Sequence, residues 1–291
     1  MKNISTMDEL DYEFFTTSNY THLFNFEKNF NFKQTQIWMK DHFPYCFLYC
    51  ALYAILIFGG KHYMSNRPKY DLRRVLVLWS ASLALFSIIA VYRTLPILLH
   101  LVRHHGFYYT TCAPSAKKHP ILSYWGYLFV LSKLVEFGDT FFIVLRKQPL
   151  IFLHWYHHIV TFLYGWLSYV EEAEYVKWFA VMNGIIHSCM YTYYTAKAMG
   201  FRLPKWISMA ITLIQLSQMF VGTFLAMLIY YYEYIAKIKC HITTLNIIVV
   251  TIMYISYAIL FARFFIQTYL SDKSVKNIGK ETDANSKLKA T

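Results

Sequence analysis

Charged residues are scarce in this chain: Asp, Glu, Lys and Arg make up 15% of its 291 residues, whereas hydrophobic residues make up 57%. A soluble globular domain is usually about 45–50% apolar, so the composition argues against a soluble protein with one core. Acidic residues are the rarer sign, with 16 Asp and Glu against 28 Lys and Arg. The net charge of +12 favours anionic partners such as lipid headgroups or phosphorylated ligands, and we expect no nucleic-acid partner.

Long apolar runs are abundant, and each approaches or exceeds the roughly 20 residues that a helix needs to cross a bilayer. The first run lacks the charged start and small-residue cleavage site of a removed signal peptide. We therefore expect an all-α integral membrane protein with a segment over 1–43, a seven-helix domain over 44–269 and a tail over 270–291. The predicted spans are 44–60, 75–101, 121–145, 150–170, 176–196, 206–232 and 242–269.

Basic residues indicate the orientation in the membrane. Loops 61–74, 146–149 and 197–205 carry ten Lys or Arg, and the alternate loops 102–120, 171–177 and 233–241 carry six. The richer side is expected in the cytosol, which places the amino terminus in the lumen and the carboxyl terminus in the cytosol.

Short motifs near both termini agree with this orientation. Glycosylation sequons at Asn3 and Asn19 need a lumenal amino terminus. Near the other terminus, Lys287 and Lys289 resemble a retrieval signal for the endoplasmic reticulum. A solvated, disordered basic tail is the alternative interpretation of that segment.

The five cysteines show no CxxC or zinc-site spacing. Cys46, Cys50 and Cys189 fall in predicted spans and are expected to be buried thiols. Cys112 and Cys240 fall in two predicted lumenal loops, and an oxidising lumen permits a disulfide between them.

Ionisable residues inside a span are costly, so they mark candidate functional sites. In the third span, Lys133, Glu136 and Asp139 recur every third residue and share one helical face. An internal ladder of ion pairs that only makes these charges tolerable is the alternative. In the fourth span, His154, His157 and His158 have the i, i+3, i+4 spacing of one helical face, which is typical of a site.

The fifth and sixth spans also carry polar residues at helical spacing. Asn183 lies one turn from His187 and could fix its tautomer. The polar residues of the sixth span could equally form hydrogen bonds between helices that have no catalytic role. The further members of these two sets are Met190, Tyr191, Tyr194, Thr212, Gln215 and Gln218.

Depth brings these polar faces together. At about 1.5 Å per residue, His157, His158, His187 and Gln215 lie in one layer, roughly 10–14 Å below the cytosolic surface. We therefore expect a buried pocket that opens to the cytosol. Basic residues at its mouth suit a substrate with a phosphate-rich headgroup and an apolar portion; the candidates are Arg74, Arg146, Lys147, Lys197, Arg202 and Arg263.

Two classes of function fit only part of this pattern. A membrane di-iron oxygenase or desaturase would use histidine boxes, and residues 100–105 (HLVRHH) look like a first box. The chain offers seven such histidines rather than about eight, however, and the topology separates 100–105 from the rest. A seven-helix receptor or transporter is disfavoured because the polar layer lies toward the cytosol.

Four motifs, KLVEFGDT, HWYHH, NGIIHSCMYTYY and TLIQLSQM, occur in an order and spacing that closely resemble the fatty acid elongases, the very-long-chain 3-oxoacyl-CoA synthases. The resemblance runs from about Met64 to about Ala262. Trp155 and Tyr156 inside the histidine motif look most like the branch that extends saturated and monounsaturated chains.

The resemblance implies that malonyl-CoA is joined to a long acyl-CoA to give a 3-oxoacyl-CoA, CO2 and CoA. It implies an acyl tunnel enclosed by the second to seventh spans and open to the cytosol. It implies no redox cofactor and no metal, and later steps carried out by a ketoacyl reductase, a dehydratase and an enoyl reductase. A homo-oligomer is left open.

Histidine is the expected nucleophile, because Cys189 should point away from the site that His187 faces. His157 is assigned as nucleophile or general base, with His187 as its partner and His154 and His158 holding geometry or polarising carbonyls. Asn183 would orient His187. Gln215 would bind a thioester or enolate oxygen, and Lys133, Glu136 and Asp139 would set the local field.

We predict that the active protein holds no catalytic metal, because three histidines on one helical face and a distant fourth do not make a di-iron ligand set. Elemental analysis of purified, active protein should find substoichiometric iron and zinc. Stoichiometric iron that is lost together with activity on chelation would support an oxygenase instead.

Overall fold

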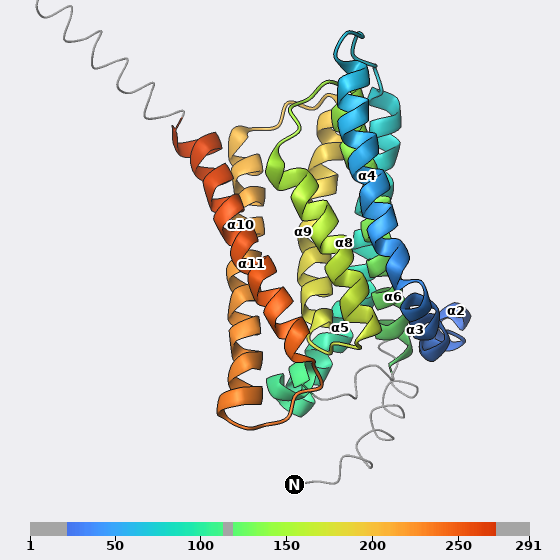
Figure 1. The fold of residues 1–291 in the computed structure, drawn as a ribbon, viewed down its shortest axis with the longest axis vertical. Coiled ribbons are helices and arrows are strands. Elements are labelled where there is room, and N and C mark those ends of the chain that lie inside the picture. The colour runs from blue at the N-terminus through green and yellow to red at the C-terminus, as the bar shows by residue number, and fades with distance from the viewer. Residues whose placement is uncertain (1–21, 113–118, 272–291) are drawn as a thin grey trace, which may run out of the picture.

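The computed structural model describes residues 22–112 and 119–271, and every regular element within them is helical. The sequons at Asn3 and Asn19 and the dilysine at Lys287 and Lys289 lie outside the described residues. Most of the helices run lengthwise along one bundle, whereas the two short helices at the start of the described chain lie across one end of it (Figure 1). The helices are α2 (Asn25–Lys28), α3 (Phe32–Asp41), α4 (Phe43–Met64), α5 (Arg73–Cys112), α6 (Pro120–Val135), α7 (Gly138–Leu145), α8 (Phe152–Val170), α9 (Val176–Met199), α10 (Lys205–Tyr230) and α11 (Thr244–Phe265).

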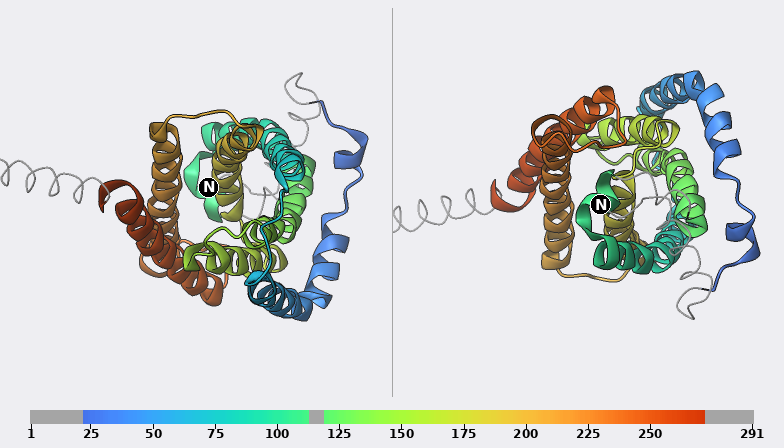
Figure 2. Two further views of the ribbon diagram at one scale, coloured as in Figure 1. Left: turned by 90° about the horizontal axis from the view of Figure 1, so that it is seen from above. Right: turned by 90° about the horizontal axis from the view of Figure 1, so that it is seen from below.

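The two ends of the bundle differ. The basic end carries the loops 65–72, 146–151 and 200–204, which follow α4, α7 and α9. The disulfide end carries Cys112 and Cys240, together with α2 and α3. Seen along its length, the bundle has α3 and α4 on its outside (Figure 2).

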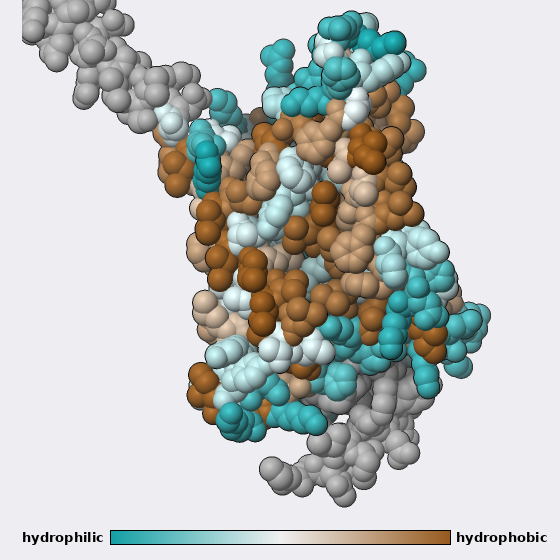
Figure 3. All heavy atoms as spheres, viewed as in Figure 1, coloured by the Kyte–Doolittle hydropathy of each residue, from teal (hydrophilic) through white to brown (hydrophobic). Residues whose placement is uncertain are grey.

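The middle of the molecule is apolar on its surface, with hydrophilic residues toward both ends (Figure 3). Four of the described helical segments are long and apolar enough to cross a membrane: Phe43–Met64, Arg73–Cys112, Lys205–Ile235 and Thr244–Leu270. The last two include π-helical turns that extend α10 and α11. The other three predicted spans are also helical, but α6 and α7 form two pieces, and α8 and α9 carry the polar motifs that lower their hydropathy.

Helix α5 is longer than predicted. The loop expected to begin at residue 102 is helical as far as Cys112, with an interruption at Gly106, whose φ is +81°. The predicted span ends where the first cluster of basic and histidine residues begins. Those side chains lie just before the kink at Gly106, and a second helical stretch then continues to Cys112.

The predicted disulfide is present: Cys112 at the end of α5 is bonded to Cys240 in the loop between α10 and α11. The backbone N–H of His241 also donates to the Cys112 carbonyl, at 3.0 Å. Of the remaining cysteines, Cys46 and Cys50 are buried as expected, but Cys189 is exposed, so the prediction of a buried thiol was wrong there. It lies on the face of α9 opposite the buried His187.

At the basic end, Arg73 caps the carboxyl terminus of α9. Its guanidinium donates from Nε to the carbonyl of Ala198 at 2.6 Å and from Nη2 to that of Met199 at 2.7 Å. Gly200 ends α9 with a φ of +98°, and a Cβ there would lie 2.1 Å from Arg73 Nη2. Only glycine therefore fits both the left-handed turn and the close approach of Arg73.

At the disulfide end, α2 is attached to α5 and α6 through Glu27, which is fully buried. Its carboxylate accepts from Arg93 Nη2 at 2.6 Å, from Arg93 Nε at 2.9 Å and from the Trp125 indole at 2.8 Å. Burial by itself raises the pKa of the Glu27 carboxyl, but hydrogen bonds from Arg93 and Trp125 outweigh it and the net pKa is lowered. No pattern in the sequence predicts that the amino-terminal segment supplies a partner for Arg93.

We expect Glu27→Gln to lower the stability by about 3 kcal/mol at pH 7, because removing one partner strands a buried charge. A lowered folded-state pKa means that this stabilisation is complete above the unfolded-state pKa of about 4.3 and is lost as the pH falls through the folded-state value. Thermal unfolding in detergent should therefore show a gap between wild type and variant at pH 7 that narrows below about pH 4. Asp41→Asn, at an exposed position on α3, is the control; an equal Glu27→Gln gap at both pH values would contradict the electrostatic explanation.

Candidate active site

Two cavities occupy the bundle. The outer cavity has a volume of about 600 Å³ and is lined from α5, α7, α8, α9, α10 and α11, with Arg146 and Lys197 of the basic end among its walls. The inner cavity, of about 120 Å³, is lined mostly by apolar side chains from α3, α5, α6, α8 and α9. Glu136, Asn183 and His187 line both, so this polar group lies at the junction of the two cavities.

Three histidines of α8 line the outer cavity, as their spacing predicted. His154 lies within hydrogen-bond distance of Thr140, with 3.0 Å between Nε2 and Oγ1, and its ring centroid is 4.4 Å from that of His158. The His157 ring lies 5.0 Å from the ring of Tyr257 on α11. Among the described residues, no hydrogen-bond partner is seen for the His157 imidazole, so its nitrogens are available to a ligand in the cavity.

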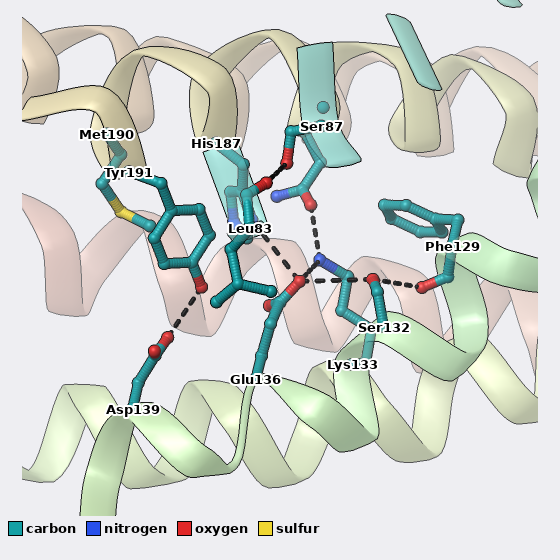
Figure 4. A network of polar contacts seen from close by, with 12 residues as sticks. Leu83, Ser87, Phe129, Ser132, Lys133, Glu136, Asp139, His187, Met190 and Tyr191 are labelled. Atoms are coloured by element: carbon teal, nitrogen blue, oxygen red, sulfur yellow. Dashed lines mark hydrogen bonds and ion pairs between the residues drawn. The ribbon is translucent and has the colours of Figure 1, made fainter. Parts of the chain in front are cut away.

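An ion pair and two hydrogen-bonding side chains hold the junction together (Figure 4). Lys133 Nζ donates to Glu136 Oε1 at 2.8 Å and to Asn183 Oδ1 at 2.7 Å. His187 Nδ1 lies 3.5 Å from the same Glu136 oxygen. With a proton on Nδ1 facing the carboxylate, Nε2 of His187 carries the free lone pair.

Asn183 does not orient His187, contrary to the prediction. Asn183 accepts from Lys133, and the group that faces His187 Nδ1 is Glu136. One turn of separation on α9 brings Asn183 and His187 to the same face, but the Asn183 amide oxygen accepts its hydrogen bond from Lys133 of α6. A charged donor makes the stronger hydrogen bond, worth about 1.5–3 kcal/mol.

Asp139 leaves the ladder that the sequence predicted with Lys133 and Glu136. The chain tightens between α6 and α7, where Asp139 N–H donates to the Glu136 carbonyl at 3.1 Å, a three-residue turn. The Asp139 carboxylate therefore meets other partners: the Trp79 indole at 2.6 Å and the Tyr191 hydroxyl at 2.7 Å. Tyr191 lines the outer cavity, and its ring lies 5.3 Å from that of His187.

Gly138 makes the contact between Trp79 and Asp139 possible. A Cβ at Gly138 would lie 2.4 Å from Cζ2 of Trp79, so any larger residue would push the indole away. Trp79 of α5 and Thr140 of α7 are site residues that the sequence argument missed. Neither has a signal in the sequence, because an apolar tryptophan and a single threonine are unremarkable in a membrane helix.

The polar residues of α10 differ in whether they line the outer cavity. Gln215 and Gln218 line the outer cavity, whereas Thr212 bonds back to the Ser208 carbonyl within its own helix, at 3.0 Å. Gln215 Nε2 lies 3.3 Å from the sulfur of Met190 on α9, which also lines the cavity together with Tyr194. The prediction that α9 and α10 face one pocket agrees with this arrangement.

The six basic residues predicted at the mouth are not equivalent. Arg146 and Lys197 line the outer cavity. Lys147 instead donates to the carbonyls of Ser65 and Arg67, at 3.0 and 2.9 Å, and so ties down the loop after α4. The remaining three are exposed without lining the cavity: Arg74, Arg202 and Arg263.

No group of three or more His, Cys, Asp or Glu side chains in the described part of the chain is arranged to hold a metal ion. The absence of a catalytic metal nevertheless stays a prediction. The donors seen here are mostly committed to one another: Glu136 to Lys133, and Asp139 to Trp79 and Tyr191.

Fold and site together define the class: an all-helical membrane protein whose histidine-rich cavity adjoins a second, mostly apolar one. A family model described as "ELO: GNS1/SUR4 family" matches residues 38–277. The chain is 47% identical over 259 residues to "Very long chain fatty acid elongase 6" of Drosophila melanogaster, covering 88% of this chain and 81% of that protein. It is 44% identical over 261 residues to the protein of that name from Gallus gallus (90% and 95%) and 42% identical over 247 residues to the one from Homo sapiens (85% and 92%).

The chain belongs to this family, the fatty acid elongases. The predicted family is therefore confirmed, and with it the class of activity, a condensing enzyme of fatty acid elongation. The oxygenase and the transporter or receptor are not favoured.

Glu136→Gln tests whether this carboxylate orients His187. We expect kcat to fall by roughly 100-fold, the scale of a lost general base, with little change in the KM for acyl-CoA, because Glu136 acts on His187 rather than on the substrate. Activity should be normalised to the monodisperse protein recovered by size exclusion.

The matched control is Glu171→Gln, which removes a carboxylate that binds Thr243 and Asn246 away from both cavities. It should leave the kcat of folded enzyme unchanged. Wild-type kcat in Glu136→Gln would show that His187 does not need this carboxylate.

Proposed function

We propose that this chain condenses malonyl-CoA with a long-chain saturated or monounsaturated acyl-CoA, through a covalent acyl-enzyme on His157. The observation that carries the proposal is the position of His157. Its imidazole lines the outer cavity without a described hydrogen-bond partner, near the junction with an inner cavity suited to an acyl chain. The products are a 3-oxoacyl-CoA two carbons longer, CO2 and CoA, and no cofactor is required.

The first half-reaction transfers the acyl group. A neutral imidazole nitrogen of His157 attacks the thioester carbonyl, the new C–N bond replaces the C–S bond, and the CoA thiolate leaves with the proton from the other ring nitrogen. Splitting the condensation in this way replaces one difficult step with two easier ones. Gln215 and Gln218 line the outer cavity, and their amides would donate hydrogen bonds to a developing oxyanion.

The second half-reaction forms the carbon–carbon bond. Malonyl-CoA loses CO2, and the electron pair left on its C2 attacks the acyl-imidazole carbonyl. The C–N bond then breaks and returns the imidazole, which regains its proton from solvent. His187, held by Glu136, would polarise the thioester of the malonyl unit or handle this proton. His154 and His158 support the position of His157 on α8.

The two cavities suit the two parts of an acyl-CoA. A volume of about 600 Å³ is within the roughly 300–1,000 Å³ of ligand pockets. Arg146 and Lys197 at its basic end would meet the phosphates of CoA, whereas the inner cavity would take the acyl chain and complete a tunnel.

The arrangement in the membrane follows from the two ends. We propose seven crossings, in which α6 and α7 share one and α8 and α9 cross despite their polar faces, because those faces line the cavities rather than meet lipid. A disulfide needs an oxidising compartment, which favours the disulfide end in the lumen of the endoplasmic reticulum. The basic end and the carboxyl terminus would then face the cytosol, where acyl-CoA is made available.

The proposed preference for saturated and monounsaturated chains is inferred from the similar proteins and not from the residues that line the cavities. Trp155, whose identity suggested the saturated and monounsaturated branch, packs on Phe58 of α4 with ring centroids 5.5 Å apart. The hydroxyl of Tyr156 lies 3.0 Å from that of Ser256 on α11. Neither is among the residues that line the outer cavity. The reductions and dehydration that follow would need a ketoacyl reductase, a dehydratase and an enoyl reductase as partners.

Incubating the purified enzyme with acyl-CoA alone tests the acyl-enzyme. We expect stoichiometric release of CoA and an intact mass increased by one acyl group, with ping-pong kinetics when malonyl-CoA is added. His157→Ala should abolish both adduct and condensation while the protein stays monodisperse in detergent. His187→Ala should be nearly as severe if the two residues act as a unit.

Cys189→Ala is the control, because its exposed thiol lies away from the cavities and its loss should change neither CoA release nor turnover. If no CoA appears until malonyl-CoA is present, and no adduct is found, the reaction passes through a ternary complex with His157 as general base.

A further inference from the structure

The inner cavity has a wall that the catalytic bundle does not supply. Phe32, the first residue of α3, lines it alongside Trp125 of α6 and Tyr169 of α8. The rings of Phe32 and Tyr169 lie 5.2 Å apart. The amino-terminal segment therefore contributes a bulky apolar side chain directly to this cavity, at the disulfide end and away from the histidines of α8.

The same segment holds two of the other wall residues in place. Trp125 lines the cavity and donates its indole N–H to the buried carboxylate of Glu27 at 2.8 Å. Tyr169 lines the cavity, and its hydroxyl lies 2.7 Å from that of Thr35 on α3. Each wall residue thus has its polar atom turned outward onto the segment and its ring turned to the cavity.

Further contacts attach the segment firmly enough to act as a wall. Glu27 is paired with Arg93 of α5, and Gln36 Nε2 donates to the carbonyl of Val170 at 2.9 Å. The Trp166 indole donates to the carbonyl of Met39 at 2.8 Å. Contacts to α5, α6 and α8 hold the segment at several points, so Phe32 cannot swing away without breaking buried hydrogen bonds.

We propose that the amino-terminal segment 24–39 closes the inner cavity and sets the longest acyl chain that the enzyme elongates. Phe32 is the specificity-determining residue, and Glu27 is a positioning residue that acts through Trp125. The inference rests on the proposed function in one respect, the entry of the acyl chain into the inner cavity. Its physical basis is steric: where a bulky ring forms part of the wall of a mostly apolar cavity, each further methylene must displace that ring or remain outside.

The test compares two phenylalanines of the segment. Phe32→Ala removes the ring that lines the cavity. Phe30→Ala is the matched control, since the Phe30 ring packs on Tyr124 and Tyr127 of α6, at 5.5 and 5.6 Å, and is not a cavity wall.

For each variant, kcat/KM is measured with two substrates. The first is the acyl-CoA that the wild type prefers, and the second is an acyl-CoA two carbons longer than the longest one that the wild type elongates well. The ratio of the two values does not depend on the fraction of folded enzyme, so a destabilised variant still gives a clear answer.

We expect Phe32→Ala to raise the ratio of long to best substrate by roughly 10-fold or more, the scale of discrimination by one or two methylenes in an apolar pocket. Phe32→Trp should lower it, and Phe30→Ala should leave it at the wild-type value. An unchanged ratio in Phe32→Ala, or an equal change in Phe30→Ala, would overturn the proposal.

Glu27→Gln separates positioning from stability. We expect it to raise the same ratio by a smaller factor, because Trp125 loses a charged acceptor and the wall loosens. A lower yield of active enzyme with an unchanged ratio would show that Glu27 is only structural. If the proposed function is wrong, the wild type forms no 3-oxoacyl-CoA from any acyl-CoA. If only this inference is wrong, condensation proceeds, and the ratio of long to best substrate is the same in the variants as in the wild type.

Discussion

A lysine buried inside an apolar helical bundle must be neutralised, and the rest of this structure is arranged around that requirement. Lys133 is 3% exposed and has two partners, Glu136 on the following turn and Asn183 on α9. Removing one partner of a buried ion pair commonly costs about 3–5 kcal/mol. The lysine therefore fixes α6 against α9, and the register that satisfies Lys133 also brings His187 beside Glu136. The Lys133–Glu136 ion pair that neutralises the lysine is thus also the group that faces His187 Nδ1.

The tightened turn between α6 and α7 gives one motif two separate tasks. On one side of it, Lys133 and Glu136 hold the junction of the cavities. Beyond it, Asp139 links Trp79 to Tyr191, and Thr140 lies within hydrogen-bond distance of both His154 and Tyr53, the latter at 2.6 Å. A continuous helix would have kept all the polar groups on one face. The break lets a short segment contact α4, α5, α8 and α9 together.

Each end of the bundle is tied by different chemistry. At the basic end, Arg73 caps α9 and Lys147 fastens the loop after α4. At the other end, a disulfide joins Cys112, the last residue of α5, to Cys240 in the loop between α10 and α11. The polar side chains of both cavities therefore stand on helices whose ends are held. A site that must keep several imidazoles and amides in a fixed relation benefits from rigid supports. Arg73 and Lys147 look like ordinary positive-inside residues in the sequence, yet both are bound to backbone carbonyls.

The helical membrane class, the set of polar faces and the cysteine pair could all be predicted from the sequence. Hydrophobic run length, helical period and loop charge are local properties, and they suffice to place the histidines of α8, His187, Gln215 and Gln218 around one pocket. Tertiary structure alone decided which partner each polar atom meets. Trp79 and Asp139 are 60 residues apart in sequence, and Glu27 and Arg93 are 66 apart. Such pairings depend on the rotation of each helix about its axis and on how closely neighbours approach, and periodicity gives a helix its polar face without giving the neighbour that the face will meet.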